Sequence, residues 1–397
     1  MTRAVTWAVP LIAVLVLAVE FPWRFEAHLD LEVYRMGVRA WWHGGDIYGP
    51  LGPTSAGIRL PFIYPPFAVA ALGPLAALPW NLAVVALFAA NLLCLGGTLF
   101  LVTRHAWPAG GLRGALLVAT AAVPVAMALE PLRETFAFGQ VNLLLMGLVA
   151  ADCLTATPRW PRGIGVGLAA AIKLTPLAFL LFFLVRKDYR AAGTAVVTAL
   201  AASAVGFAID ARASVKYWFG GLAGAGGLSG SPYRTNQSVE AVLVRLGLPS
   251  GAAKFWWIVL ALVLLVLAVT AMRRSEPVVA LAANAGFALL ASPISWSHHW
   301  IWVAPALLMM ALYGFRRARE RRWGAAAGWW GSAALTGTLC TVAPFRYLSA
   351  HDKPSMVWSI AEQVPGNAYA LLGTLLLVTY ALTKVRRAEP RADAASP

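Results

Sequence analysis

The sequence predicts an all-α protein that crosses a membrane many times. Of its 397 residues, 60% are hydrophobic and only 12% are charged, whereas about a quarter of the residues in a soluble domain are charged. The mean hydropathy is +0.69. Apolar runs long enough to cross a hydrocarbon layer of about 30 Å recur along the chain. We therefore expect one transmembrane domain, residues 1–397, with no separate soluble part.

The apolar runs predict about 12 membrane segments. The first run has no small-residue cleavage site after it, so we interpret it as a membrane span and not as a signal peptide. The predicted segments are 4–22, 81–103, 114–129, 141–155, 163–172, 176–185, 190–209, 255–272, 278–291, 300–314, 324–342 and 368–384.

The distribution of the net charge of +15 predicts the orientation of these segments. With the N-terminus inside, the cytoplasmic connections carry 19 basic and 6 acidic residues, whereas the outer connections carry 12 and 11. This is the positive-inside pattern, and it places both termini, including the tail 385–397, in the cytoplasm. Because the basic residues follow the topology and do not form one patch, they indicate contact with anionic lipids and argue against nucleic-acid binding.

With this orientation, the long connections 23–66, 210–254 and 343–367 lie outside a cell membrane, as does the short segment 292–300. These connections contain most of the polar and aromatic residues that fall outside the apolar runs. Loops carry function more often than the elements they connect, so we expect the active site on the extracytoplasmic face.

Asp30, in the first of these connections, is the main candidate for catalysis. If a helix begins near it, one face of that helix is nearly apolar with a carboxylate at its head, and carries Asp30, Val33, Tyr34, Gly37, Val38 and Trp41. A carboxylate on a buried face is costly unless it is used, although Asp is also a favoured N-cap residue. Glu32 falls on the opposite face, where an exposed ion pair with a nearby arginine is expected.

Lys173 lies inside an apolar stretch that is interrupted by Pro176. Proline removes a backbone donor and disfavours helix in the residue before it, so we expect 163–185 to form two short helices in a hairpin. Leaving the ammonium group in lipid would cost at least about 2.5 kcal/mol, so Lys173 should face a cavity and an anion. The alternative is that the side chain extends to the membrane surface.

The other polar candidates lie near the outer ends of the predicted segments. Gln140 and Asn142 could bind sugar hydroxyls or cap a helix, and the triplet that begins at Asn236 matches a glycosylation acceptor that also arises by chance. Paired histidines are unusual in an aromatic belt, which favours a functional role for His298 and His299. The candidates in this group are Tyr64, Gln140, Asn142, Asn236, Gln237, His298 and His299.

Several classes of protein have no support in the sequence. The three cysteines lie in or at the end of apolar segments without metal-like spacing, so we interpret them as packing residues. There is no glycine-rich phosphate loop and no zinc-protease motif. No internal repeat marks an inverted-repeat transporter.

Six short motifs occur in order between about residues 20 and 310. They are Asp30-Leu31-Glu32-Val33-Tyr34, Leu60-Pro61-Phe62-Ile63-Tyr64-Pro65-Pro66-Phe67, Gly139-Gln140-Val141-Asn142, Ala171-Ile172-Lys173-Leu174-Thr175-Pro176, Asn236-Gln237-Ser238 and Ser292-Pro293-Ile294-Ser295-Trp296-Ser297-His298-His299-Trp300. Each motif alone is weakly specific, but their order is specific. Together they resemble glycosyltransferase family 87, the polyprenol-phosphate-mannose-dependent mannosyltransferases of the GT-C superfamily. The C-terminal third has no matching motif.

The resemblance implies a GT-C helical bundle with an extracytoplasmic site in which Asp30 is the catalytic aspartate and His298 or His299 is the site histidine. It also implies a polyprenyl-phosphate sugar as donor and a cell-envelope glycolipid or glycan as acceptor. Lys173 and the two histidines would hold the donor phosphate, and Tyr64 and the amides named above would contact sugar or acceptor.

A phosphate leaving group needs charge stabilisation and not a proton, so a single carboxylate is enough for transfer. As general base, Asp30 would activate an acceptor hydroxyl for in-line attack with inversion, which converts a β-linked donor into an α-mannoside. Asp30 and Glu32 point away from each other on a helix, so no metal is required, although a divalent ion stays an alternative. The alternative function is a transporter or flippase of lipid-linked saccharides, which would also need an intramembrane lysine and a cavity.

Overall fold

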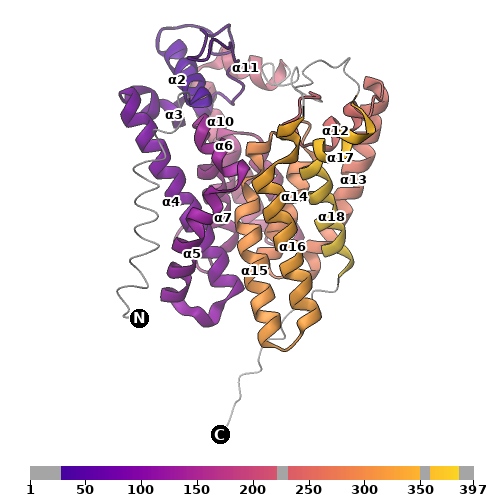
Figure 1. The fold of residues 1–397 in the computed structure, drawn as a ribbon. Coiled ribbons are helices and arrows are strands. Elements are labelled where there is room, and N and C mark those ends of the chain that lie inside the picture. The colour runs from indigo at the N-terminus through magenta and orange to yellow at the C-terminus, as the bar shows by residue number, and fades with distance from the viewer. Residues whose placement is uncertain (1–27, 221–230, 349–357, 384–397) are drawn as a thin grey trace.

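The computed structural model describes residues 28–220, 231–348 and 358–383. Within these ranges the regular structure is helical, apart from one isolated bridge between Asn236 and Trp296. The helices stand side by side in an upright bundle (Figure 1). The all-α prediction is therefore confirmed. The predicted first span, 4–22, and the tail, 385–397, lie outside the described residues.

Long apolar helices identify a polytopic membrane protein. Among the described residues, four helices are long and apolar enough to cross a membrane, and the number rises to six if each of two bent helix pairs is one span. The bent pairs are α6 with α7 and α17 with α18. The four helices are α4 (Trp80–Ala106), α5 (Gly111–Met127, preceded by the turn η2, Pro108–Gly110), α10 (Tyr189–Ile209) and α13 (Ser250–Arg274).

The remaining predicted segments within the described residues also coincide with helices, most of them shorter. Apolar composition alone predicted where these helices lie. They are α7 (Asn142–Leu154), α8 (Ile164–Ile172), η3 with α9 (Thr175–Phe179 and Leu180–Val185), α14 (Pro277–Ala291), α15 (Val303–Arg319), α16 (Trp323–Val342) and α18 (Ala368–Leu382).

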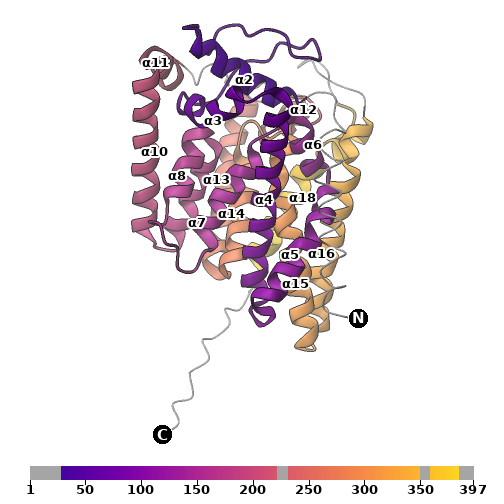
Figure 2. The ribbon, with the colours of Figure 1, turned by 90° about the vertical axis from the view of Figure 1, so that its left-hand side faces the viewer.

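Short helices in the connections build one end of the bundle. Figures 1 and 2 both place α2, α3 and α11 there, and the Tyr48 ring stacks on Tyr217 of α11 at 5.9 Å. The sequence predicted only α2 among these elements. They are α2 (Leu29–Trp42), α3 (Phe67–Ala77), α6 (Glu130–Phe138), α11 (Ala211–Phe219), α12 (Val239–Arg245), η5 (Ser297–Trp302), η6 (Pro344–Tyr347) and α17 (Ile360–Gly366).

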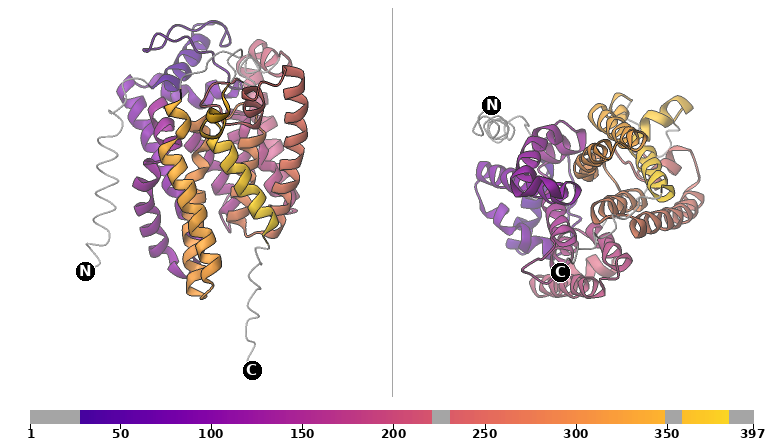
Figure 3. Two further views of the ribbon diagram at one scale, coloured as in Figure 1. Left: turned by 45° about the vertical axis from the view of Figure 1, so that its right-hand side comes forward. Right: turned by 90° about the horizontal axis from the view of Figure 1, so that it is seen from below.

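The bundle has two parts that follow the order of the chain. Viewed along its length, the helices up to α11 gather on one side and those from α14 to α18 on the other (Figure 3). α15 packs against α4, which joins the two sides. At the end that carries α2, short segments from both sides converge, so residues far apart in the sequence can share one cavity.

A sharp break between α6 and α7 brings the family motif at Gly139 against α2. The two helices meet at 118°, and Gly139 ends α6 with φ of +65°, a conformation that glycine adopts without strain. A Cβ atom at Gly139 would lie 2.8 Å from the Cβ atom of Leu31. Only glycine therefore permits this close approach, which sets Gln140 beside the first turn of α2.

The segment 163–185 is broken at the predicted place. α8 ends at Ile172, and Lys173 has an extended backbone (φ −147°, ψ 128°) before η3 begins at Thr175. The two ends of the segment lie together, because Arg162 Nε is 3.8 Å from Asp188 Oδ2. The chain thus enters, turns near Lys173 and returns, which is the geometry of a hairpin.

Candidate active site

A cavity of about 840 Å³ lies at the end of the bundle that carries α2. Its lining comes from both sides of the bundle, and it contains six of the nine candidate site residues. These six are Asp30, Tyr64, Gln140, Lys173, His298 and His299.

Asp30 lies in the first turn of α2, and its side chain lines the cavity. The predicted face is buried at Val33, Tyr34, Gly37 and Val38, while Trp41 at its far end is half-buried. The helix begins at Leu29 with His28 as its N-cap, so the alternative of Asp30 as the cap residue is wrong. Burial raises the pKa of Asp30 from 3.8 to about 6, although Lys173 and Gln140 partly oppose this shift. At neutral pH the carboxylate can therefore accept a proton.

Glu32 has a different environment, and the predicted ion pair with a neighbouring arginine is wrong. Its carboxylate accepts hydrogen bonds from the backbone nitrogen of Ser55, at 2.7 Å, and from the Ser55 hydroxyl. Arg35 is buried and donates to the carbonyl groups of Leu75 and Leu78. Glu32 thus fixes the first connection and is absent from the cavity lining. The two acids point apart, as the helical spacing predicted.

Tyr34, Tyr64 and Gln140 form a hydrogen-bonded cluster next to Asp30. The Tyr34 hydroxyl donates to Gln140 Oε1 at 2.8 Å and lies 3.3 Å from the Tyr64 hydroxyl. Asn91 donates to the Gln140 carbonyl at 2.8 Å, which holds that backbone in place. Gln140 and Tyr64 both line the cavity, so their polar groups are available to a ligand beside the carboxylate.

Lys173 is anchored at the break between α8 and η3. Its ammonium group donates to Asn142 Oδ1 at 2.9 Å and approaches His299 Nε2 at 3.3 Å. The nitrogen also lies 5.7 Å from the centre of the Tyr64 ring, a cation–π distance. These contacts are to neutral groups, and its charge also acts on Asp30. Lys173 therefore faces the cavity as predicted and presents a positive charge there.

The two histidines occupy distinct positions. His299 contacts Lys173, whereas the His298 ring packs edge-on against Phe138 at 5.2 Å and against His299 at 4.7 Å. Burial and the charge of Lys173 keep the pKa of both rings well below the usual value, so they are neutral. The His298 carbonyl accepts hydrogen bonds from Thr135 and Asn142. The segment that carries both rings is therefore fixed to α6 and α7.

The other three candidates support the site from behind. Asn142 is buried and bonds both Lys173 and the His298 carbonyl. Asn236 and Gln237 are fully buried and absent from the cavity lining. Their side-chain amides bond backbone groups, including the Ser295 nitrogen at 3.0 Å and the Tyr369 nitrogen at 3.1 Å. Asn236 therefore holds the 292–300 segment, Gln237 holds the junction of α17 and α18, and neither lines the cavity.

The sequence did not predict a second charged group in the cavity, which comes from α6 and η6. Glu130 is fully buried and accepts hydrogen bonds from Ser297, Arg346 and Tyr369 at 2.8, 2.8 and 2.9 Å. Glu134, one turn further along α6, pairs with Arg346, and both line the cavity. Glu130 and Arg346 are 216 positions apart, so no local pattern connects them.

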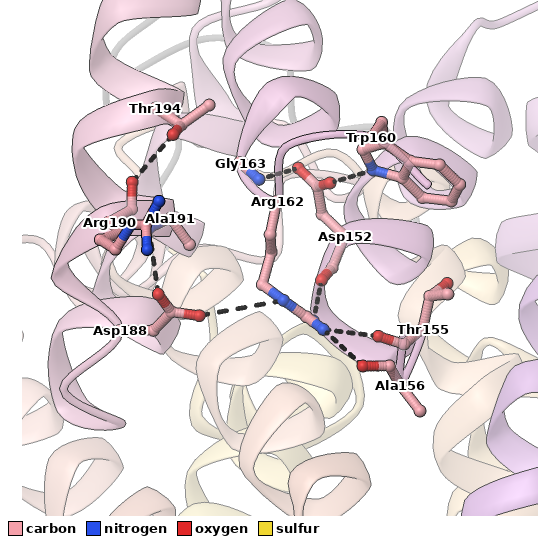
Figure 4. Close-up of polar contacts among 10 residues, drawn as sticks. All are labelled: Asp152, Thr155, Ala156, Trp160, Arg162, Gly163, Asp188, Arg190, Ala191 and Thr194. Carbon is pink, nitrogen blue, oxygen red and sulfur yellow. Dashed lines mark hydrogen bonds and ion pairs between the residues drawn. The ribbon is translucent and has the colours of Figure 1, made fainter. Parts of the chain in front are cut away.

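Another buried acid, Asp152, lies far from the cavity at the opposite end of α7 from Asn142, about 15 Å along the helix axis. Its carboxylate accepts hydrogen bonds from Trp160 Nε1 at 2.8 Å and from the backbone nitrogen of Gly163 at 3.0 Å (Figure 4). The backbone nitrogen of Val166 also donates to it, at 2.9 Å. These bonds cap the start of α8. Asp152 is thus a structural residue that fixes the hairpin carrying Lys173.

Around Asp30 the site combines an ionisable base, the cation of Lys173 and two neutral imidazoles, in a cavity at the end of a membrane bundle. A base beside a fixed cation can activate a hydroxyl while an anionic group leaves, which is group-transfer chemistry. Glu134 is a second carboxylate, but Arg346 neutralises it. The fold and the site thus define a class, a polytopic membrane protein with the equipment of a transferase.

Comparisons with known proteins identify the family. The model of glycosyltransferase family 87 matches residues 62–293, and the chain belongs to that family. It is 35% identical to a Mycolicibacterium smegmatis protein named polyprenol-phosphate-mannose-dependent alpha-(1-2)-phosphatidylinositol mannoside mannosyltransferase, over 92% of this chain and 86% of that protein. A Mycobacterium tuberculosis protein of the same name is also 35% identical, over 93% and 89%.

A second Mycobacterium tuberculosis relative has a different acceptor in its name. It is called a polyprenol-phosphate-mannose-dependent alpha-(1-2)-phosphatidylinositol pentamannoside mannosyltransferase and is 33% identical over 90% of this chain and 82% of the relative. No solved structure gives a significant match to the chain. The resemblance predicted from the six motifs is confirmed.

Proposed function

We propose that this protein transfers a mannosyl residue from a polyprenyl-phosphate-mannose donor to a phosphatidylinositol mannoside and forms an α-(1→2) linkage. The observation that carries this proposal is the position of Asp30 in one cavity with the Lys173 and His299 pair, in a chain of family 87. The names of the 35%-identical relatives supply the donor and acceptor classes. No comparison favours the transporter alternative.

Asp30 is the general base in this mechanism. Its pKa of about 6 leaves it ionised at neutral pH and still basic enough to take the proton of an acceptor hydroxyl. The hydroxyl oxygen attacks the anomeric carbon as the bond to the phosphate oxygen breaks, and the configuration inverts. A β-linked donor therefore gives an α-linked product.

Lys173 holds the donor phosphate and stabilises the charge that develops on it. The ammonium group is positioned by Asn142 and His299, so it needs no rearrangement when the phosphate arrives. The neutral His299 ring accepts from the ammonium group through Nε2, so its part in phosphate binding is to hold Lys173 in place. The scheme uses no metal ion, and Gln140 and Tyr64 contact the transferred sugar.

The topology is part of the proposal. Twelve membrane segments in a GT-C bundle, with both termini in the cytoplasm, place the cavity on the extracytoplasmic face of the cell membrane. The charge distribution supports this orientation, and the cavity lies at the end formed by α2 and α11, as the predicted outer connections require. Labelling with a membrane-impermeant thiol reagent in intact cells tests it. A cysteine introduced at Gly45 should react and one at Arg319 should not.

The central test is a transfer assay with purified protein in nanodiscs, sugar-labelled polyprenyl-phosphate-mannose and phosphatidylinositol mannoside. The expected product carries one additional α-linked mannose. The Asp30→Asn variant should bind the donor and fail to transfer, because asparagine cannot accept the proton. If the protein moves donor lipid between leaflets without forming a product, and Asp30→Asn does so equally well, the transporter alternative is correct.

A further inference from the structure

The cavity has a second polar region away from Asp30, and the proposed reaction does not use it. This region contains Glu134 and Arg346, with the rings of Tyr233 and Trp296 beside them in the lining. We propose that it is the binding site for the saccharide of the acceptor, one or more sugar units away from the hydroxyl that reacts. This inference rests on the proposed function and assigns a part of its substrate to residues of which only Trp296 belongs to one of the six motifs.

The position of Glu134 on α6 shows how this site is connected to Asp30. Glu134 and Phe138 are one turn apart, about 6 Å along the helix axis, and both line the cavity. Phe138 contacts the His298 ring, which contacts His299 beside Lys173. α6 then ends at Gly139, and Gln140 lies next to Asp30. A chain of sugars bound at Asp30 can thus extend along α6 toward Glu134.

The polar groups of Glu134 and Arg346 can form hydrogen bonds with the hydroxyl groups of a sugar. Glu134 is partly exposed, with 20% of its side chain accessible, and the ion pair with Arg346 uses only one of its two oxygens. Arg346 uses Nε for Glu130 and Nη2 for Glu134, and the guanidinium carries five N–H donors in all. A carboxylate that accepts beside a guanidinium that donates can bind two adjacent hydroxyl groups. Charged partners make such hydrogen bonds strong.

The aromatic rings of Tyr233 and Trp296 can pack against the apolar C–H face of a sugar. Trp296 and Tyr233 lie edge to face at 6.3 Å, and both line the cavity. Their faces offer apolar area on which the C–H face of a pyranose can pack. The bridge between Asn236 and Trp296 fixes the backbone beneath one ring. Two carboxylates, Glu130 and Glu134, balance two guanidinium groups, Arg346 and the Arg234 group that donates to the Arg346 carbonyl. This balance favours a neutral saccharide over the acceptor's phosphate group.

The network beneath the charged pair makes the site rigid. Glu130 is fully buried and holds Arg346 from behind, while it also accepts from Ser297 and Tyr369. Arg346 is therefore fixed in position before a ligand binds. This lowers the entropic cost of recognition, and it gives the C-terminal third of the chain a role in the site.

The test measures KM for donor and acceptor separately in the full-length protein, with two acceptors: phosphatidylinositol mannoside and a neutral octyl dimannoside. Glu134→Gln should raise the acceptor KM about tenfold for both, as expected for the loss of one charged hydrogen bond. The donor KM should stay unchanged. Trp296→Leu keeps the backbone bridge and should also raise both acceptor KM values. Arg133→Gln, at an exposed neighbouring position on α6, is the matched control and should change neither.

Two results would overturn the proposal while the proposed function stands. If Glu134→Gln affects only the phosphate-containing acceptor, this end of the cavity binds the phosphate group. If Glu134→Gln and Trp296→Leu both fold and leave the acceptor KM values within twofold of wild type, no sugar binds there. Failure of the proposed function gives a different result, in which the wild-type protein transfers no mannose from the donor to either acceptor.

Discussion

Replacing Asp30 with asparagine is expected to stabilise the fold and to abolish turnover. Burial raises the Asp30 pKa from 3.8 to about 6, a shift of about 2 pH units, and each unit corresponds to about 1.4 kcal/mol. The charged carboxylate therefore lowers the free energy of unfolding by up to about 3 kcal/mol at neutral pH. Asparagine keeps the shape and can still bond Gln140, so we expect a gain of about 1–3 kcal/mol at pH 7.5.

The size of this effect depends on pH in a way that can be checked. A raised carboxyl pKa means that the folded protein binds the proton more tightly than the unfolded chain does. The destabilisation is therefore absent below about pH 4, grows between about pH 4 and 6, and is complete above about pH 6. Asp30→Asn should raise the melting temperature by a few degrees at pH 7.5 and change it little at pH 4.

The assay combines thermal unfolding in detergent with transfer kinetics on the same preparations. Turnover should fall about 10²–10⁴-fold, the usual contribution of a general base, while donor binding is retained. Asp210→Asn is the matched control, because Asp210 caps α11 through the Ala213 nitrogen at 2.8 Å and asparagine caps almost equally well. A lower melting temperature for Asp30→Asn at pH 7.5 would refute the reasoning, since the carboxylate would then be held by favourable contacts.

The remaining predictions concern the donor site, the two acids of α2 and the hairpin. Lys173→Met should raise the donor KM at least tenfold and leave the acceptor KM unchanged. If the variant binds the donor as tightly as the wild-type protein does, the phosphate is held by other residues. Wild-type kcat/KM should fall tenfold per unit below about pH 6, because protonated Asp30 cannot act as base; an acid limb near pH 4 would contradict this. Glu32→Gln should change turnover less than threefold. Asp152→Ala should lower the free energy of unfolding by about 2–4 kcal/mol, measured against Arg159→Gln.

The sequence predicted the parts of the site that depend on local physics. The face of α2 follows from the helical period, and the break at Lys173 follows from Pro176 and from the cost of a charge among apolar residues. The helices α4, α10 and α13 follow from long apolar runs. Each of these features is determined by fewer than about thirty consecutive residues.

The parts that could not be predicted depend on contacts between distant segments. Glu130 and Arg346 belong to different sides of the bundle, and neither has neighbours that indicate a pair. Asn236 and Gln237 have the residue types of a sugar site, but their amides bond Ser295 and Tyr369 backbone groups. A polar side chain in a loop serves the backbone as readily as a ligand, and only the folded arrangement distinguishes the two roles.

The arrangement of charges in the cavity explains why a single carboxylate can act as the base. Lys173 raises the local positive potential at the donor end, whereas Glu134 is neutralised by Arg346 at the far end. Asp30 lies near the Lys173 end, in a site where burial opposes its charge. In the proposed mechanism, proton transfer to Asp30 removes that unfavourable charge at the moment when negative charge grows on the leaving phosphate beside Lys173. The buried charge that destabilises the resting protein is thus neutralised in the transition state. An interaction that improves between the ground state and the transition state lowers the activation barrier.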